Sequence, residues 1–457
     1  MAYADITLTE AEDLLARLLA DPDKIRFVSD ELQTRIIEAV RTWSALSGIY
    51  DATSNPIAIA AGSVFVDLPA LGADPGIPYT LLESDLLGPI EYALIEPKQI
   101  VAWSGSEMFT LAELQEAIRR RRDQFLLETR CRVDRVQLPA TPLPSGSASY
   151  ALPDTTVAVM RVAWAESAGG KVTPVWRSNH WSVRTSRPGL QQTVGLPRVY
   201  DFHSYAPPSL APSPVPSDNG TFDLLLVRSG AIVTGGLTYL GIPDDFAWAI
   251  QWGALADLLS KDGPSRDYAR SLYCERRYRL GVAAMLERQT ITDVTINGQP
   301  MKFTTIGALD SGRLYWQNRS AAIPLYAAPV GANMIVLADP PSSACNLVVR
   351  ILRNAPVPTL GYGAEFVQVG REFLDMILGY AVHLSMFKIG GTEFAATTHL
   401  ANAMFDAAAE FNARLRESSA FEEVRFSDHQ SGPSRRGIQR VTGASVGGAQ
   451  QQEEGTG

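Results

Sequence analysis

Residues 242–278 read IPDDFAWAIQWGALADLLSKDGPSRDYARSLYCERRY, and this stretch decides the fold. Its first half is apolar nearly all round a helix, with Phe246, Trp252 and Leu258 on different faces. The turn residues Asp262-Gly263-Pro264 interrupt that pattern, and a second helical pattern runs from about residue 265 to 288. Two helices joined by so short a turn fold back on each other. The stretch therefore predicts a helical hairpin whose first helix needs packing partners on every side.

A second helical hairpin is predicted nearer the C-terminus. Apolar residues recur at helical spacing over 366–384 and again over 400–415, and Gly390-Gly391 separates the two runs. Both hairpins follow segments that lack helical periodicity. The chain thus alternates between helical and non-helical regions.

Three further helices are predicted toward the N-terminus. Thr9 and Glu12 form a capping box before the first helix, and the same pattern recurs at Thr110 and Glu113 before the third. The second helix is capped by Ser29 or Asp30 and ends near Gly48.

The remaining segments, 57–103, 154–242 and 290–357, consist of short alternating or apolar runs broken by glycine and proline, which is typical of strands. Residues 63–69 are echoed at 147–153, which is compatible with an internal duplication and equally with chance similarity. The predicted fold is α+β, with helical hairpins forming the core, large sandwich-like β-sheet insertions and a flexible C-terminal tail.

The order of these patterns divides the chain into four parts. Residues 1–105 carry helices and a small β region, and 106–289 carry a helix, a β domain and the first hairpin. Residues 290–426 hold a β segment and the second hairpin, and 427–457 form an extended tail.

Composition excludes some classes of function. A formal net charge of −9 gives no global basic field that would hold nucleic acid by counterion release. Cys131, Cys274 and Cys345 lie far apart, which favours reduced thiols in a cytosolic setting over a disulfide framework. The N-terminus has no signal-peptide pattern and no apolar run reaches membrane-spanning length, so we expect a soluble protein without a membrane partner.

The sequence shows no catalytic, cofactor-binding or metal-binding motif, so no catalytic, cofactor or metal residue is predicted and no enzyme activity is expected. The five histidines lack metal-ligand spacing. His383 and His399 lie on the two arms of the second hairpin, where a hydrogen-bonded packing role is the favoured interpretation. Cys274 has cationic neighbours that could activate a thiol, but a buried helix cysteine is the simpler interpretation.

Arg119-Arg120-Arg121-Arg122 covers a full helical turn, so its guanidinium groups point in several directions. A solvated face, ion pairs between subunits and contact with DNA phosphates are alternatives that the sequence leaves open.

The stretch 242–278 resembles the helical hairpin of the head-to-tail connector (neck adaptor) proteins of tailed phages. That family has a Leu/Ile-Pro-Asp strand exit, an apolar helix, a glycine turn and an Arg-Asp-x-Ala-Arg-x-x-Tyr helix. Here the last group consists of Arg266, Asp267, Ala269, Arg270 and Tyr273. Residues 29–43 and 110–129 are similar to the first helix of the same proteins. The large β regions and the second hairpin depart from small adaptors, which leaves the downstream partner open.

The resemblance implies a structural virion protein that forms a ring of about twelve copies beneath the portal and links the DNA-filled capsid to the tail. It implies assembly in the host cytoplasm and a place in the neck of the virion. The implied partners are other copies of the chain, the portal protein, a downstream tail or nozzle protein, and passing double-stranded DNA without sequence-specific binding. The hairpin residues expected between neighbouring subunits are Trp248, Trp252, Arg270, Tyr273 and Arg277.

From about residue 427 the chain is too polar to fold alone. Arg435, Arg436 and Arg440 surround Ile438 in a composition suited to docking along an acidic groove, and the resemblance implies that the groove belongs to the portal. A purely solubilising tail is the alternative.

Two other functions remain open. One is a baseplate or tail-hub structural protein, and the other is a tail-associated polysaccharide-degrading enzyme on a β-rich scaffold. Paired carboxylates in a cleft of the folded monomer would favour the enzyme.

Overall fold

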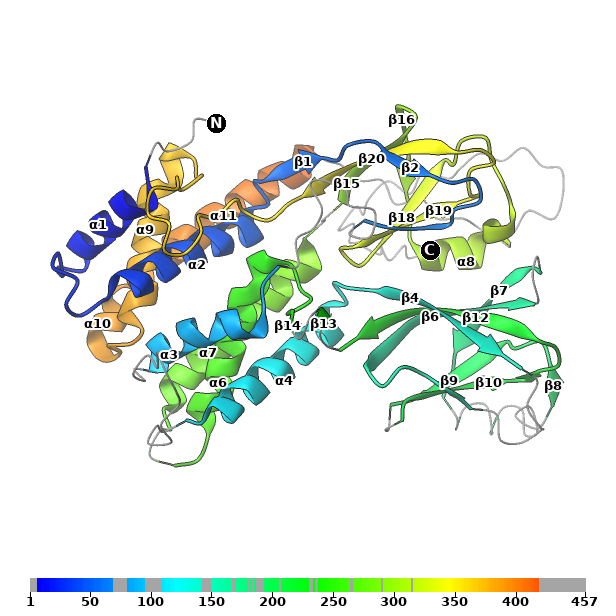
Figure 1. Ribbon diagram of the computed structural model, residues 1–457, viewed down its shortest axis with the longest axis horizontal. Coiled ribbons are helices and arrows are strands. Elements are labelled where there is room, and N and C mark those ends of the chain that lie inside the picture. Colours follow the sequence, from blue (N-terminus) through cyan, green and yellow to red (C-terminus); the bar gives the residue numbers. More distant parts are fainter. Residues whose placement is uncertain are drawn as a thin grey trace, which may run out of the picture.

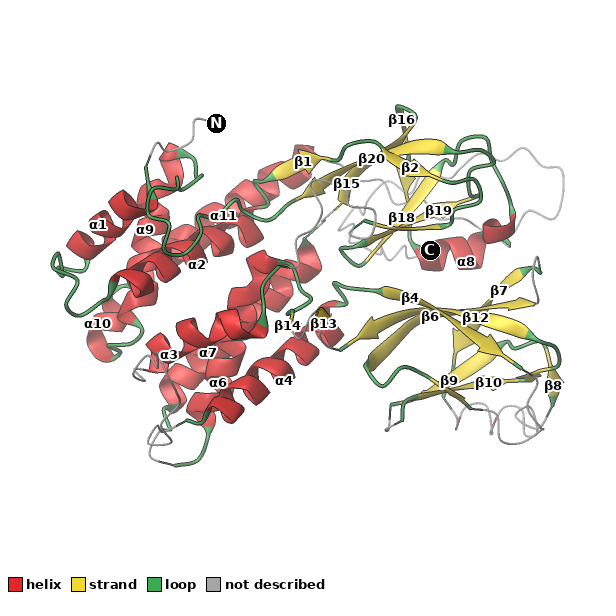
Figure 2. Ribbon diagram, viewed as in Figure 1, coloured by secondary structure: helices red, strands yellow, loops and turns green. Residues whose placement is uncertain are grey.

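The structure is a computed structural model that describes residues 6–68, 80–94, 109–141, 149–166, 170–179, 181, 185, 193–204, 207–229, 233–234, 237–263, 266–288, 291–313 and 315–418. It contains both helices and sheets, so the predicted α+β class is confirmed. The long helices gather at one end of the molecule and the sheets at the other (Figure 1; Figure 2).

Ten α-helices lie in the described residues. They are α1 (Leu8–Leu18), α2 (Ser29–Ser47), α3 (Leu87–Leu94), α4 (Leu111–Thr129), α6 (Ala247–Ser260), α7 (Tyr268–Glu287), α8 (Ile306–Gly312), α9 (Arg371–Met386), α10 (Gly391–Ala396) and α11 (Thr398–Ser418). Both predicted hairpins are present, as α6–α7 and as α9–α11 with α10 between them.

Two of the sheets form one β module. The five-stranded sheet contains β1 (Asp51–Thr53), β2 (Ile57–Ile59), β15 (Ile291–Ile296), β16 (Gln299–Pro300) and β20 (Cys345–Leu352). The four-stranded sheet contains β3 (Phe65–Asp67), β17 (Lys302–Phe303), β18 (Tyr326–Val330) and β19 (Met334–Ala338).

A seven-stranded sheet forms the other β module. Its strands are β4 (Asp134–Ala140), β5 (Tyr150–Ala151), β6 (Thr156–Glu166), β7 (Val172–Arg177), β9 (Val199–His203), β10 (Ser209–Ser213) and β12 (Gly220–Arg228). Two small pairs accompany it, β8 (Val194–Gly195) with β11 (Val215–Pro216) and β13 (Val233–Thr234) with β14 (Leu237–Thr238).

Strand pairing shows that one unit is inserted into another. Asp51 of β1 lies opposite Leu352 of β20, and Val66 of β3 lies opposite Ile335 of β19. The intervening residues form their own helices and their own seven-stranded sheet. We call residues 80–288 the inner unit, and residues 6–68 together with 291–418 the outer unit.

The predicted consecutive domains 1–105 and 290–426 are therefore wrong, because their strands share sheets with each other. Residues 106–289 come close to the inner unit, but α3 precedes them and packs on α6. Local sequence patterns carry no record of strands that pair across more than two hundred residues. The predicted tail, 427–457, lies outside the described residues.

Both units have the same order of elements: a long helix, a β module and a helical hairpin. The long helix is α4 in the inner unit and α2 in the outer unit, and the hairpins are α6–α7 and α9–α11. The echo between 63–69 and 147–153 is not part of this correspondence. β3 pairs with β19 in the four-stranded sheet, whereas β5 lies at the edge of the seven-stranded sheet.

Several local predictions are confirmed. Thr110 caps α4 with Glu113 in a capping box, and Gly48 ends α2 in the left-handed conformation. Asn297 and Gly298 form the turn between β15 and β16 with positive φ at both residues.

Other local predictions are wrong. The first capping box joins Thr7 and Glu10, not Thr9 and Glu12, so α1 starts earlier. The N-cap of α2 is Val28, without a side-chain cap. Residues 83–94 are helical, whereas their pattern predicts strands. Pro89 lies in the first turn of α3, where its missing N–H costs no hydrogen bond.

Buried contacts hold the two β modules together. Val133 and Leu225 of the inner unit share a core cluster with Trp316 and Val336 of the outer unit. Arg161 on β6 donates two hydrogen bonds to Asp310 on α8, at 2.6 and 2.8 Å. The two β modules are thereby fixed to each other.

Candidate assembly surface of the helical layer

The acidic pair that precedes α6 anchors the inner unit within the chain. Asp244 accepts hydrogen bonds from the backbone of Thr80 and Leu81 at 3.0 and 3.1 Å. Asp245 accepts from the Ser44 hydroxyl of α2 and from the Ala355 backbone N–H at 3.0 Å. Burial raises the pKa of Asp245, although the nearby Arg288 opposes this shift. The two aspartates of the fold-deciding stretch thus have a structural role.

A buried carboxylate on α2 joins the two units. Glu38 accepts hydrogen bonds from the Trp252 indole at 2.7 Å and from the Gln251 amide at 3.3 Å, both on α6. Arg35 donates to the same carboxylate from within α2 at 3.1 Å. The Arg277 guanidinium of α7 lies 4.0 Å from it. A carboxylate of the outer unit therefore binds polar groups from both arms of the inner hairpin.

Aromatic rings surround Arg277. Its guanidinium lies 5.1 to 5.5 Å from the ring centroids of Trp248, Trp252, Tyr380 and Phe405. Two of these rings belong to the inner hairpin and two to the outer hairpin. Cation–π attraction of this kind strengthens when the cation is desolvated, as it is here.

The intersubunit role predicted for Trp248, Trp252 and Arg277 is therefore corrected. Their exposed fractions are 2%, 0% and 3% within the single chain. The sequence shows correctly that α6 needs partners on all sides. It does not show that α2 and the outer hairpin provide those partners within the same chain.

The other two residues predicted for the subunit interface are half-buried and also bind inside the chain. Arg270 donates to the Lys388 carbonyl at 2.9 Å. The Tyr273 hydroxyl lies 2.8 Å from Nε2 of His383. All five predicted hairpin residues thus contribute to the contact between the two units.

His383 has the predicted hydrogen-bonded packing role. Its Nδ1 lies 2.9 Å from the Thr397 hydroxyl, and its ring stacks on Phe394 at 4.5 Å. Burial, with the Arg277 charge, lowers the pKa of His383 to about 3. Cys274 is buried as predicted, and burial raises its pKa. Within the described ranges, no cluster of three His, Cys, Asp or Glu side chains could hold a metal ion.

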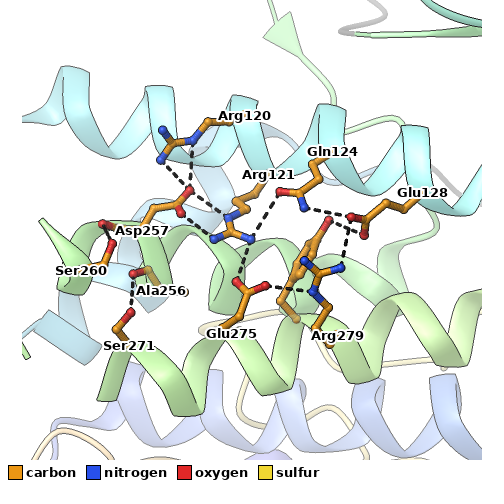
Figure 3. Close-up of polar contacts among 11 residues, drawn as sticks. Arg120, Arg121, Gln124, Glu128, Ala256, Asp257, Ser260, Ser271, Glu275 and Arg279 are labelled. Atoms are coloured by element: carbon orange, nitrogen blue, oxygen red, sulfur yellow. Dashed lines mark hydrogen bonds and ion pairs between the residues drawn. The ribbon is translucent and has the colours of Figure 1, made fainter. Parts of the chain in front are cut away.

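The arginine run of α4 forms an ion-pair ladder with the inner hairpin (Figure 3). Arg121 binds Asp257 of α6 at 2.5 Å and Glu275 of α7 at 2.8 Å, and Arg120 binds Asp257 at 2.6 Å. Arg279 continues the ladder by binding Glu275 at 2.9 Å. Glu128 of α4 completes it, 3.3 Å from Arg279. Arg119 and Arg122 bind Glu83 instead.

The ladder has cations outside and carboxylates beneath. The side chains of Arg120 and Arg279 are 61% and 57% exposed, whereas those of Asp257, Glu128 and Glu275 are 16%, 25% and 30% exposed. An approaching partner therefore meets guanidinium groups first. We call this surface of Arg120, Arg279 and the adjoining faces of α4 and α7 the cation layer.

Only part of the ladder is visible in the sequence. Glu275 and Arg279 stand four residues apart on a helix, a spacing that predicts an ion pair. Asp257 is the single charged residue of α6, and a lone carboxylate on an apolar helix indicates a buried partner. Neither signal identifies Arg121 of α4 as the shared partner.

A cavity of about 520 Å³ lies where α2, α7 and α11 approach the five-stranded sheet. Leu46, Ile49, Leu280 and Phe405 give it an apolar lining, and Asp406 and Ala409 of α11 also line it. The cavity thus lies along the boundary between the two units.

A second cleft, of about 410 Å³, lies between the β modules and is lined by Asp67 and Asp134. Asp134 is 3.5 Å from Arg132 and 3.8 Å from Arg228. Burial and the Asp134 charge raise the pKa of Asp67. The cleft therefore holds two carboxyl groups that repel each other.

The predicted portal-docking residues, Arg435, Arg436, Ile438 and Arg440, lie outside the described residues. Among the helices that are described, none combines the length and apolar character needed to cross a membrane. No protein-family model matches the chain, and no curated protein matches it.

Proposed function

We propose that this chain is a structural subunit of a tailed-phage neck, a head-to-tail adaptor that forms a ring beneath the portal and links the capsid to the tail. The ring would leave a channel for the genome. The hairpin and β modules would act as binding surfaces, and no catalytic step is assigned to them.

One observation carries the proposal: the stretch that resembles neck adaptors forms the centre of the helical layer. The α6–α7 hairpin contacts α2 and α4 and lies beside the outer hairpin. The features that carry the resemblance, Asp244 before α6 and the Asp267 cap of α7, make defined contacts. The resemblance therefore concerns residues that determine the architecture.

The separation of helices from sheets supports the same function. The helical layer and the two β modules occupy opposite ends of the molecule (Figure 2). An adaptor needs two such ends, since it contacts the portal on one side and a tail component on the other. In this proposal the helical end contacts the portal and neighbouring copies, and the β end receives the tail.

The test is assembly with the portal protein of the same phage. We expect negative-stain images of the mixture to show a second ring beneath the portal, and the mass of the complex to give the copy number. Strictly monomeric protein that does not associate with the portal would overturn the proposal.

The C-terminal tail offers a narrower test of portal docking. Truncation after residue 426 is expected to abolish or strongly weaken portal association without changing the fold of the described residues. A second variant, with Arg435, Arg436 and Arg440 replaced by alanine, separates charge from chain length. Unchanged portal binding by the truncated chain would refute the docking role.

A polysaccharide-degrading enzyme is the second candidate, and the cleft between the β modules favours it. Burial and the Asp134 charge raise the pKa of Asp67, and both carboxyl groups line this cleft, whereas glycoside hydrolysis uses a pair of carboxyl groups of which one acts as the acid. The test is release of reducing ends from the host's surface polysaccharide. Activity that is lost in both Asp67→Asn and Asp134→Asn would support the enzyme, and no release by the unaltered chain would exclude it for that substrate.

A further inference from the structure

The contact between the two units inside the chain shows how a hairpin of this type docks. The inner hairpin packs against α2 and against the outer hairpin, and Glu38 and Arg277 lie at its centre. Because both units have the same order of elements, the inner unit has an equivalent docking surface, formed by α4 and α7. No described segment covers that surface in the way that the inner hairpin covers α2.

Burial of the two long helices shows this difference. In α2, 14 of 19 residues are buried, because α1, its own hairpin and the inner hairpin each cover part of its surface. In α4, 7 of 19 are buried, and its outer face carries Arg120 of the cation layer. One docking surface is thus occupied within the chain and the other is open.

The outer hairpin has an exposed face of complementary character. The exposed residues of α11 between 402 and 413 are small, polar or acidic, and none is basic. They are Asn402, Ala403, Asp406, Ala409, Glu410 and Ala413. We call this surface the acidic α11 face. Its alanines allow another helix to approach closely, and its carboxylates suit a layer of guanidinium groups.

We propose that the acidic α11 face of one copy packs on the cation layer of a neighbouring copy. This inference deepens the proposed ring and rests on the self-association that the ring requires. The partner is a second copy of this chain, and the contact repeats between copies the hairpin docking that occurs once inside each chain.

The geometry of the contact leads to a ring or an open array. The two surfaces lie on different units, so the interface is head-to-tail and each copy uses one surface for each neighbour. A head-to-tail interface closes into a ring when the rotation that relates neighbouring copies is a whole fraction of a full turn.

Double-stranded DNA is a less suitable occupant of the cation layer. Arg120, Arg121 and Arg279 each have a carboxylate partner within 3.0 Å, so few charges remain to be neutralised by phosphate. Phosphate binding draws its free energy from cations that displace condensed counterions. A partner with only a few carboxylates can instead share the exposed guanidinium groups.

Charge exchange tests the contact. Asp406→Arg and Arg120→Glu are each expected to weaken self-association about tenfold, because each places like charges opposite each other. The double variant restores an opposite-charge pair and should return to within about threefold of the unaltered chain. Mass photometry across a concentration series, with and without portal, gives the association, and thermal melting confirms folding. Asp218→Arg and Arg319→Glu, on exposed residues elsewhere, are the matched controls.

A cross-link provides a readout that does not depend on affinity. Chains carrying Arg120→Cys and chains carrying Ala409→Cys are mixed and oxidised. The three native cysteines are buried, so a disulfide-linked dimer should form only in the mixture.

The outcomes separate the contact from the proposed function. Rings that form on the portal but respond neither to charge reversal nor to the cysteine pair overturn this interface and leave the adaptor function standing. Chains that never assemble, with or without portal, overturn both. If Arg120→Glu loses binding to a 30-base-pair DNA duplex while assembly is unchanged, the occupant of the cation layer is DNA and not a second copy.

Discussion

The inner and outer units share one order of elements but use it differently. In the outer unit the long helix α2 is enclosed, and its Glu38 carboxylate is 5% exposed. In the inner unit the long helix α4 lies at the edge of the helical layer, with ion pairs near the surface (Figure 1; Figure 3). One helix therefore serves the interior of the chain, while the other is free to serve contacts outside it.

Loss of a charged group should cost more folding free energy around α2, where the charges are buried, than around α4, where they are near the surface. Removing one partner of a buried ion pair or hydrogen bond leaves the other polar group unpaired in the interior. This costs much free energy, because water cannot replace the lost contact. An exposed ion pair contributes little, because water and salt screen it. We therefore expect substitutions at the junction of the units to have large effects on stability, and those in the cation layer to have small ones.

The largest effect is expected for Glu38→Ala. This change leaves Arg35, Gln251 and the Trp252 indole without their acceptor in the interior, and we expect a loss of about 3 to 5 kcal/mol in the free energy of unfolding. Urea denaturation at pH 7 followed by circular dichroism measures it. Glu38→Gln keeps an acceptor for Trp252 and should lose less. A loss under about 1 kcal/mol for Glu38→Ala would show that the junction is not held by this carboxylate.

Protonation of His383 should produce the next largest effect. The unfolded chain takes up this proton near pH 6.5, whereas burial and Arg277 keep the folded pKa near 3. Its contribution to stability is therefore complete above pH 6.5 and is lost as the pH falls from 6.5 toward 3. By pH 5 the loss is about 2 kcal/mol. Denaturation midpoints for the unaltered chain and for His383→Gln, compared at pH 7 and pH 5, isolate this contribution. Equal pH dependence of the two proteins would contradict it.

Local patterns predicted the elements of the fold better than their arrangement. The helices around Trp248 and Thr110, and the turn at Asn297, follow from periodicity, capping and turn chemistry that act within a few residues. The insertion of one unit into the other does not, because the pairing of β1 with β20 depends on residues 300 positions apart. The helical segment 83–94 was missed because Gly88 and Pro89 interrupt it, as in a loop, although Leu86, Ile90 and Ala93 stand at helical spacing.

The candidate surface was predicted in part. Arg119 to Arg122 were singled out as a charge run, and ion pairs between subunits were one alternative, beside a solvated face and contact with DNA. Their partners are Asp257, Glu275 and Glu83 of the same chain, which come close only in the folded state. Conversely, Trp248 and Arg277 were assigned to a subunit interface because the sequence shows a need for burial but not the element that meets it.

The two hairpins differ in how closely their helices pack at a glycine. A Cβ added at Gly281 on α7 would lie 2.4 Å from the Ala249 side chain on α6, whereas at Gly379 on α9 it would make an ordinary 3.4 Å contact with Leu400. We expect Gly281→Ala to cost about 1 to 2 kcal/mol, since overpacking outweighs the better helix propensity of alanine. Gly379→Ala should be neutral or stabilising by up to about 1 kcal/mol. Thermal melting of both variants measures this, and equal effects would contradict the closer packing of the inner hairpin.

The smallest effects on folding are expected in the cation layer. Arg120→Ala and Arg279→Ala each remove an exposed end of the ladder, and Asp257 and Glu275 keep Arg121 as a partner. We expect each change to reduce the free energy of unfolding by less than about 1 kcal/mol, with the difference shrinking as salt rises to 0.5 M. Urea denaturation at low and high salt measures it. A loss as large as that expected for Glu38→Ala would contradict this prediction. It would show that these arginines hold the helices of the inner unit together. A small effect on folding leaves their outward-facing guanidinium groups available for a contact with another molecule, which is the role that distinguishes α4 from α2.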